Sequence, residues 1–277
     1  EHGCHVYMEK PFVRTLEEAD AVVRLCEMKH LKLAIAHTNR YTPVRSAVKN
    51  LIESGELGDI LEYRGRCKED ARSGGGACVF LLGWGVLDLM GAFAGDPANC
   101  FATVLENGHP ITKSDVKEGN EGIGPLAGDA IDAMYTLPGG AMGYFSSHRG
   151  AAGNPSRFGL QILGTKGIVF MPSGYLVPAF FLKDGSWSPG RTGSKWAPIT
   201  SAGLNKPEPL VGNGLHGGNV AAVHDLIEAI EKDRQPLCSV YDGRASIEMI
   251  AACFESQRLG KPVDLPLKNR ANPRTLL

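Results

Sequence analysis

The pattern of hydrophobic and polar positions along the chain changes near residue 60. Before it, apolar runs at residues 5–8 and 31–36 have the length and composition of buried strands. Between them, Thr15-Leu-Glu-Glu18 has the form of a helix capping box and is followed by apolar residues at helical spacing. Strand, helix and strand in this order make a βαβ unit, so this part predicts a parallel sheet. Thr42-Pro43 then predicts another helix, with threonine as the N-cap.

In the rest of the chain, apolar and polar residues alternate, which is typical of strands with one buried face. Glycine-rich turns at residues 138–140 and 164–167 indicate hairpins. The predicted strands cover residues 61–67, 100–105, 130–137, 141–147, 158–163, 168–171 and 180–182. Together they predict a large open, mainly antiparallel sheet with one face covered. Helices are expected over residues 219–232 and 245–259, and a long surface loop over residues 186–212.

Charge and hydropathy exclude several kinds of partner. The 277 residues include 29 basic and 30 acidic side chains, for a net charge of -1. This balance gives no electrostatic reason to expect a nucleic acid or an anionic membrane as a partner. Residues 77–95 are nearly apolar, but their glycines and the central Asp88 favour a helix buried in the protein over a membrane span.

The cysteines and the first histidines give no sign of a metal site. The chain has seven cysteines, an odd number. Several stand beside apolar residues, as buried free thiols do, so a reducing cytoplasm is the expected location. His2, Cys4 and His5 lie close together but run into a strand without a second group of ligands, so we expect no metal there.

Two segments match the G-x-G-x-x-G/A string of dinucleotide sites, in which a strand leads through glycines into a helix. Gly122-Ile-Gly124-Pro-Leu-Ala127 precedes a strand, which is the wrong element. Gly212-Asn-Gly214-Leu-His-Gly217 precedes a helix, but the proline-rich segment before it cannot form a central strand. We therefore interpret both segments as ordinary glycine turns.

Glu9-Lys10-Pro11 is more informative, because it stands at the end of a predicted parallel strand. Ligands of open α/β sheets bind beyond the carboxyl ends of the strands, so a lysine there faces the cleft. Its ammonium group can bind a hydroxyl or carbonyl oxygen, or transfer a proton if burial lowers its pKa. Taken alone, the segment also fits a solvated lysine before a turn.

Taken with its surroundings, His5-Val-Tyr-Met-Glu-Lys-Pro-Phe12 resembles the signature of the glucose–fructose oxidoreductase/inositol dehydrogenase/MocA (Gfo/Idh/MocA) family. The resemblance continues in the same order along nearly the whole chain. Its further matches are Asn39-Arg-Tyr-Thr-Pro43, Ser54-Gly-Glu-Leu-Gly-Asp-Ile60, Gly74-Gly-Gly76, Leu87-Asp-Leu-Met90 and Gly164-Thr-Lys-Gly167.

The resemblance implies an α/β protein with two parts. Residues 1–42 would be the C-terminal part of a Rossmann-like dinucleotide-binding domain, and residues 43–277 a substrate domain whose open sheet forms a homo-oligomer. The implied reaction is hydride transfer between NAD or NADP and a carbon that bears a hydroxyl group, in a sugar or polyol. Lys10 would orient the substrate hydroxyl. The residues that would border the nicotinamide are Glu9, Lys10, Pro11, Asn39 and Arg40.

The sequence departs from the family's pattern in two ways. The family has a glycine-rich phosphate loop before the Glu-Lys-Pro strand, and here that strand begins at residue 5, so we expect a piece of a longer protein. The family also carries a histidine three residues before the aspartate of Leu-Asp-Leu and an aspartate four residues earlier still. This chain has Gly85 and Leu81 there, so the usual proton-relay pair is missing. His148, at the end of a predicted strand, is a candidate substitute base, although a surface histidine is the simpler interpretation.

Two other functions stay open. A relative that uses NAD as a tightly held helper would cleave a glycoside, by hydrolysis or elimination, without net formation of NADH. A member that has lost its relay would bind a sugar or a protein partner without catalysis. The missing pair favours this last function, and the retained Glu9-Lys10-Pro11 opposes it.

Overall fold

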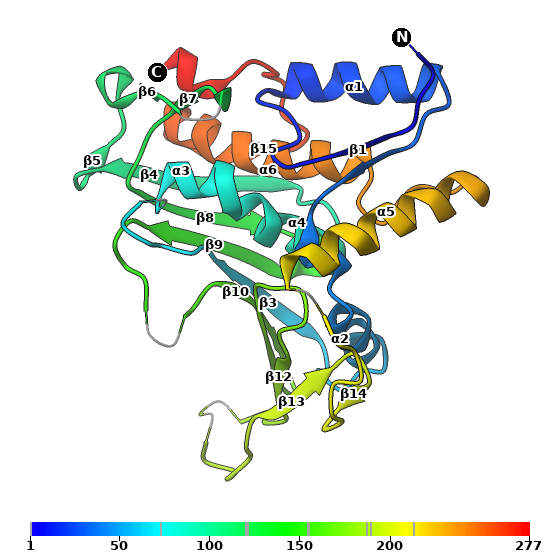
Figure 1. Cartoon of the computed structure of the whole chain (residues 1–277). Helices are drawn as coiled ribbons and strands as arrows, with labels where there is room; N and C mark the ends of the chain where they lie inside the picture. The colour runs from blue at the N-terminus through cyan, green and yellow to red at the C-terminus, as the bar shows by residue number, and fades with distance from the viewer. Residues whose placement is uncertain are drawn as a thin grey trace.

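A mixed sheet of eleven strands dominates the structure, and the helices α4 (Trp84–Ala94) and α6 (Val240–Leu259) cover one of its faces (Figure 1). Within this sheet β3 and β9 run parallel, and the other neighbouring strands run antiparallel. In spatial order the strands are β14 (Gly203–Leu204), β13 (Ala197–Thr200), β12 (Ala179–Leu182), β11 (Ile168–Pro172), β10 (Gly159–Gly164), β3 (Ile60–Arg66), β9 (Met142–His148), β8 (Ala130–Thr136), β4 (Asn99–Glu106) and β15 (Val263–Asp264), with β5 (His109–Pro110) paired to β4. The predicted α/β fold with a large, mainly antiparallel sheet is confirmed.

The computed structural model describes residues 2–72, 74–119, 122–153, 156–186, 188, 190–212 and 214–277, without the side chains of residues 77, 81 and 215. None of the helices in these ranges combines the length and the apolar character that a membrane span requires.

The first part of the chain forms the predicted βαβ unit. β1 (Val6–Met8) and β2 (Leu33–Ile35) pair in parallel, with Met8 opposite Ile35, and α1 (Leu16–Met28) connects them and packs on α6. The Thr15 hydroxyl accepts a hydrogen bond from the Glu18 N–H at 3.1 Å, as a capping box requires. The Glu18 carboxylate, however, accepts from the backbone N–H of Arg14 at 2.9 Å, so only half of the predicted box forms.

The other helices surround the ends of β1 and β2 or cover the sheet. They are the 3₁₀ turn η1 (Thr38–Tyr41), α2 (Val44–Glu53), α3 (Gly76–Cys78), the π-helical turn η2 (Val79–Gly83) and α5 (Leu215–Glu231). Short peripheral elements are η3 (Lys113–Asp115), β6 (Lys117–Glu118), β7 (Pro125–Leu126), η5 (Pro138–Gly140) and η6 (Pro273–Leu276). The apolar stretch predicted as a buried helix is therefore α3, η2 and α4 in succession. Every described residue of α4 from Trp84 to Met90 is buried.

Several local predictions were wrong for identifiable reasons. The segment predicted as a loop over residues 186–212 contains β13 and β14, which extend the sheet. Thr42 does not cap α2, because its hydroxyl donates to the Tyr175 carbonyl at 2.5 Å. α6 begins at Val240, earlier than predicted, because Ser239 forms a capping box ahead of the apolar pattern.

Not all of the buried cysteines are free thiols. Cys67, just beyond the end of β3, and Cys78, at the end of α3, form a disulfide. Both are fully buried, and the link joins the sheet to the helical segment that leads into α4. Among the remaining cysteines, Cys26, Cys100, Cys238 and Cys253 are buried and free, as expected, and Cys4 is exposed.

Candidate active site

Lys10 lies just beyond the end of β1, at the carboxyl end of the parallel pair. Its side chain is half-buried, and no carboxylate lies within 4.0 Å of its ammonium group in the ranges that the structure describes. The neighbouring Glu9 carboxylate turns toward α5, where it accepts a long hydrogen bond of 3.4 Å from Asn219 Nδ2. Pro11 follows Lys10 in a cis peptide. Lys10 thus keeps its hydrogen-bonding capacity at the end of the sheet where ligands of such folds bind.

Asn39, in η1, lies beyond the end of β2, and the two atoms of its side-chain amide differ in their hydrogen bonds. Its Oδ1 accepts hydrogen bonds from the Ser173 hydroxyl at 3.1 Å and from the Gly174 N–H at 3.2 Å. Its Nδ2 group donates to no partner within the described part of the chain, and it points at α4. A side chain at Gly85 would bring a Cβ to 3.2 Å from Nδ2. The missing side chain at position 85 therefore leaves the Asn39 amide uncovered on that side.

The first turn of α5 completes the surroundings of η1. A Cβ at Gly217 would lie 2.4 Å from the Tyr175 ring, and one at Gly218 would lie 3.0 Å from the Thr38 side chain. A real Cβ does not come as close as 2.4 Å, and 3.0 Å is a tight contact, so these glycines allow α5 to pack closely on η1 and on the loop after β11. The Gly212–Gly217 string follows no strand directly, and the Gly122–Ala127 string leads into β7 and β8. Over the residues that the structure describes, neither string joins a strand to a helix, as expected.

Arg40 is the centre of a buried polar network between β2, α4 and α6. Its guanidinium group binds the Asp88 carboxylate through two hydrogen bonds of 2.8 and 2.9 Å and reaches the Asp88 carbonyl at 3.1 Å. The remaining nitrogen donates to Asp242 at 2.7 Å and to the Leu237 carbonyl at 3.3 Å. All five N–H donors of the guanidinium are thus used within the protein. This arrangement links α4 to the start of α6 and leaves Arg40 without a donor for a ligand.

Asp88 is an ionised carboxylate in a fully buried position. Burial alone would raise its pKa, but the attraction of Arg40 and His37 outweighs burial and holds the pKa of Asp88 well below its usual range. The Ser246 hydroxyl also donates to its Oδ1, at 3.3 Å. A carboxylate held in this way stays charged and does not accept a proton near neutral pH.

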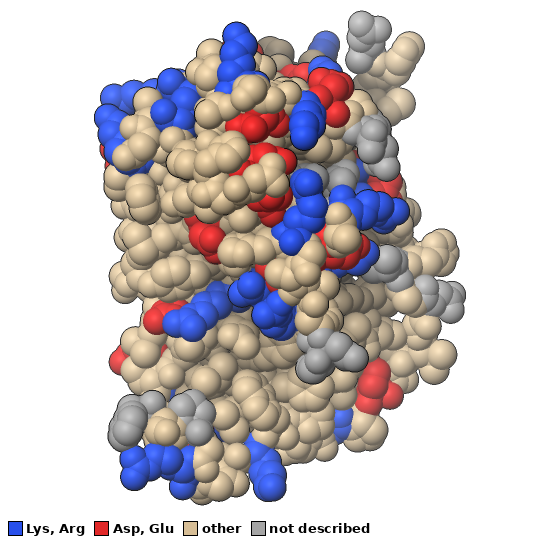
Figure 2. Space-filling model, turned by 90° about the vertical axis from the view of Figure 1, so that its left-hand side faces the viewer, with Lys and Arg blue, Asp and Glu red and all other residues tan. Residues whose placement is uncertain are grey.

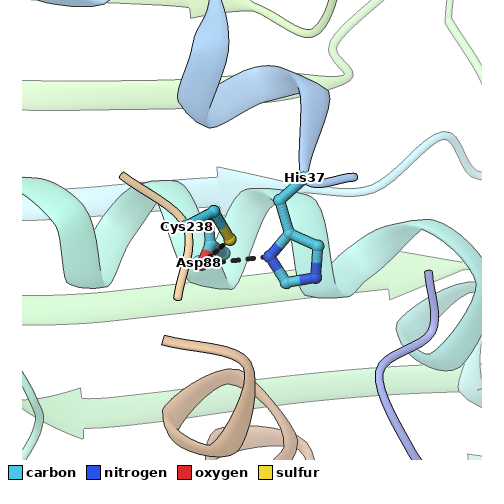
Figure 3. Close-up of side chains that lie close together, drawn as sticks. All are labelled: His37, Asp88 and Cys238. Carbon is cyan, nitrogen blue, oxygen red and sulfur yellow. Dashed lines mark hydrogen bonds and ion pairs between the residues drawn. The ribbon is translucent and has the colours of Figure 1, made fainter. Parts of the chain in front are cut away.

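His37 meets Asp88 from the end of β2 (Figure 3). Its Nδ1 lies 3.1 Å from Asp88 Oδ1, although the N–H direction is off the line to the oxygen, so the contact is electrostatic more than a well-formed hydrogen bond. The ring stacks on Trp84, with 4.0 Å between ring centroids and 28° between planes. Figure 3 shows Nε2 on the side of the ring away from Asp88. The imidazole is therefore fixed on one side by charge and on one face by stacking.

His37, Asp88 and Cys238 bring three metal-ligating atoms within 4.8 Å of one another. Two features argue against a metal ion there. The Arg40 guanidinium already occupies both carboxylate oxygens of Asp88 and would repel a cation. Burial, and then the nearby Asp88 charge, raise the pKa of the Cys238 thiol well above its usual value, whereas a metal binds the thiolate. The group is better described as a charged network with a neutral thiol beside it.

His148 lies on the opposite face of the sheet from this network. Along β9, Gly143 and Phe145 face the helical segment that contains α4. The Ser147 hydroxyl lies on the same side, where it accepts a hydrogen bond from the Gly75 N–H. By strand alternation His148 points to the open face, where its Nε2 lies 2.8 Å from Asp132. The structure therefore does not bring His148 together with Lys10 or Asn39.

Two features of the sequence point to this buried polar network. Asp88 is the one charged residue in the apolar segment 77–95, and a buried carboxylate needs a cation or donors around it. His37 stands directly before the quoted Asn39-Arg40 pair. No local spacing connects them, however, because the hydrogen-bonded partners of Arg40 lie about 50 and 200 residues away along the chain. Leu81, at the other position of the missing relay, lies outside the described side chains.

Comparisons with known proteins agree with this fold. The family model described as "Oxidoreductase family, C-terminal alpha/beta domain" (GFO_IDH_MocA_C) matches residues 49–265. Levoglucosan dehydrogenase from Pseudarthrobacter phenanthrenivorans is 25% identical over 292 residues, which covers 96% of this chain and 75% of that protein. The scyllo-inositol 2-dehydrogenase (NADP(+)) IolW of Bacillus subtilis is 37% identical over 62 residues, 22% of this chain and 17% of that protein.

Solved structures resemble the chain over nearly its whole length. A levoglucosan dehydrogenase in complex with NADH and levoglucosan has a TM-score of 0.74 and 22% identity, and the match covers 95% of this chain and 74% of that one. An aldose-aldose oxidoreductase from Caulobacter crescentus complexed with glycerol has a TM-score of 0.67 and 20% identity, covering 95% and 72%. At these identities the likeness concerns the fold. The family model spans most of the chain, and the chain therefore belongs to the Gfo/Idh/MocA family of oxidoreductases.

Proposed function

We propose that the protein is a NAD- or NADP-dependent oxidoreductase that oxidises a CH–OH group of a sugar or polyol. The observation that carries the proposal is Lys10, which ends a parallel strand without a carboxylate partner, in a chain of this family. Relatives whose names include NADP and whose structures contain NADH with levoglucosan support the cofactor and the substrate class.

The residues around Lys10 fit a planar, polar ring such as nicotinamide. Among the described residues Asn39 Nδ2 has no acceptor, and Gly85 has no Cβ that would cover it. Glu9, Lys10 and Pro11 would border the ring from the end of β1, and Asn39 from η1. Arg40 would support this wall through Asp88, because its own donors are committed. When bound, the nicotinamide supplies the hydride acceptor.

Lys10 would perform the work on the substrate oxygen. Its ammonium group donates a hydrogen bond to the hydroxyl and orients the carbon that loses hydride. As the carbonyl forms, the hydroxyl proton must leave, and Lys10 can receive it when its amine is neutral. Asn39 Nδ2 offers a second donor for a hydroxyl or an amide oxygen, without taking part in proton transfer.

The test is a kinetic assay of the protein expressed from its complete reading frame, with NAD or NADP and a panel of sugars and polyols. We expect net formation of reduced cofactor, and we expect Lys10→Ala to lower kcat by roughly 10²–10⁴-fold. Lys29→Ala, at the exposed end of α1, is the matched control and leaves the rate unchanged. Equal rates for Lys10→Ala and the unmodified protein would refute the role of Lys10.

A second candidate function follows from the bare backbone at Gly85. Without a titratable side chain there, the protein would bind a sugar or a partner and turn nothing over. Calorimetry that detects sugar binding, together with no reduced cofactor under any condition, would favour this function. Product formation from a glycoside without net reduction of NAD would instead identify the family chemistry in which the cofactor is recycled.

The open face of the sheet supports a homo-oligomer. A continuous row of neighbouring side chains crosses it, from Phe101 and Met134 through Tyr144, Arg64 and Gln161 to Phe170 and Phe180. Phe101 and Met134 are exposed, and a cavity of about 550 Å³ lies around Arg64 and Tyr144. On the side of the molecule that Figure 2 shows, the left-hand side of Figure 1, charges of both signs are interspersed. Light scattering with Met134→Asp tests the oligomer, which we expect this change to dissociate.

A further inference from the structure

The proposed reaction leaves one proton without a destination, and the described structure contains a group suited to receive it. Lys10 can hold the proton only briefly if the next cycle is to begin with a neutral amine. Asp88 cannot take it, because Arg40 keeps that carboxylate charged. His148 lies on the other face of the sheet. His37, at the end of β2, is the acceptor that the arrangement around Asp88 favours.

The register of the parallel pair brings Lys10 and His37 to the same place. Met8 is opposite Ile35, and the Ala36 N–H donates to the Met8 carbonyl at 2.9 Å. Lys10 stands two residues after Met8, and His37 stands two residues after Ile35. Neighbouring strands are about 4.8 Å apart, and a lysine stem is long enough to bridge that distance. Both residues therefore stand at the carboxyl end of adjacent strands.

His37 is held in one orientation by two residues of α4. Asp88 from α4 lies 3.1 Å from Nδ1, and Trp84 from the same helix covers one face of the ring. Asp88 itself is bound by Arg40 from η1, and the neutral Cys238 thiol from the segment before α6 lies beside it. A proton on Nδ1 is stabilised by the carboxylate, which leaves the lone pair on Nε2, the nitrogen directed away from Asp88 (Figure 3).

We propose that His37 and Asp88 form a buried proton-accepting dyad that replaces the missing relay of α4, with His37 acting through Lys10. In the oxidation, the substrate O–H bond breaks and its proton passes to the neutral amine of Lys10. A proton of the resulting ammonium then passes to His37 Nε2, which forms an imidazolium beside the Asp88 carboxylate. In reduction the two transfers run backwards. The inference rests on the proposed function for its reaction, while the arrangement of His37, Asp88 and Trp84 is a feature of the structure.

His37 is a positioning and relay residue here, since at 1% exposure it is too deeply buried to touch a sugar. The absence of a side chain at Gly85 is consistent with this assignment. α4 supplies no acid–base group at that position, yet on either side of it the helix supplies Trp84 and Asp88, the two residues that fix the imidazole. The acid–base function would thus have moved from α4 to the end of β2.

The first test needs no turnover. Nitrogen chemical shifts of His37, measured by long-range proton–nitrogen correlation in the 277-residue chain, report which ring nitrogen carries the proton. We expect the proton on Nδ1 and an unprotonated Nε2. Asp88→Asn should shift the population toward the other tautomer; if that variant does not fold, Trp84→Phe keeps the charge and should retain the Nδ1–H form. A proton found on Nε2 in the unmodified chain would overturn the dyad.

The second test uses kinetics of the protein expressed from its complete reading frame. We expect His37→Gln to lower kcat at neutral pH by about 10²-fold while KM stays within about twofold, because the substrate does not contact His37. His148→Gln is the matched control and leaves kcat unchanged. An active protein whose His37→Gln variant has the same kcat refutes the dyad alone, whereas an inactive unmodified protein refutes the proposed function.

Discussion

Replacing Arg40 by methionine tests how much the buried network stabilises the fold. The change removes the guanidinium but keeps an unbranched side chain of similar length. It leaves the Asp88 carboxylate fully buried, with His37 and the Ser246 hydroxyl as its remaining polar neighbours within 3.3 Å. It also removes the hydrogen bonds that connect α4 to Asp242 at the start of α6. The variant thus separates a buried ion from its main partner without creating a new charge.

The expected loss follows from the burial of Asp88, whose side chain has no exposed surface. Removing one partner of a buried ion pair costs about 3–5 kcal/mol, because the other charge is left uncompensated. A typical domain has a free energy of unfolding of about 5–15 kcal/mol, so this is a large fraction of the total. Asp88→Leu together with Arg40→Met should recover most of the loss, since the uncompensated charge is then gone.

Urea denaturation followed by circular dichroism measures the effect. The control is Arg64→Met, which breaks an exposed ion pair with Glu62 and should change the free energy of unfolding little. The pH dependence adds a signature. In the unmodified protein the pKa of Asp88 is lowered, so its contribution is complete above about pH 4 and is lost only as pH falls below that. In the Arg40→Met variant, burial raises the pKa of Asp88. The difference in the free energy of unfolding between the variant and the unmodified protein should therefore become smaller as pH falls from 7. A deficit below about 1 kcal/mol, or one that widens on acidification, would contradict the role assigned to Arg40.

Three further predictions concern other parts of the chain. Gly91→Ala should stabilise the protein by about 0.5–1 kcal/mol, because the added methyl group meets nothing within 4 Å in α4. Gly85→Ala should not stabilise it, because the methyl group there meets Asn39 at 3.2 Å, and thermal unfolding of both variants tests the difference. Calorimetry should find NAD and NADP binding to the 277-residue chain weaker than micromolar, because neither glycine string connects a strand to a helix, and tighter binding would show that one string was misread. Thiol titration of the denatured chain should find five thiols without reductant and seven with it, because Cys67 and Cys78 are paired; seven in both cases would exclude the disulfide.

The sequence was sufficient for the fold wherever one face of an element is buried. Period-two alternation located β3, β4, β8, β9, β10 and β11, because each of these strands has one buried apolar face, and the short apolar run Phe180–Leu182 located β12. It failed at β13, where Pro198 and flanking glycines resemble a loop, although its Ile199 is completely buried against the sheet. The start of α6 was missed because the Ser239–Asp242 capping box precedes the apolar pattern.

The candidate site was only partly accessible from sequence. Lys10 was proposed because it follows a strand, and Glu9, Pro11 and Asn39 because they match motifs of the family. What the sequence could not reveal is which groups are already committed. The five donors of Arg40 are used by acceptors that lie about 50 and 200 residues away, and only the tertiary structure shows that none remains for a ligand. The same holds for His148, whose strand was correct but whose side of the sheet depends on the register of β9.

The stability of the network and its proposed role in proton transfer have the same physical origin. A guanidinium that binds both oxygens of Asp88 makes the carboxylate a permanent charge, which stabilises the fold at neutral pH and disqualifies Asp88 as a base. That fixed charge is what a neighbouring imidazole requires, because it orients the ring and stabilises the imidazolium that forms when a proton arrives. Arg40→Met should therefore affect both properties: it lowers the free energy of unfolding, and it frees Asp88 to take the proton that His37 would otherwise hold. A variant that loses stability but keeps the Nδ1–H tautomer of His37 would show that the two roles are separable.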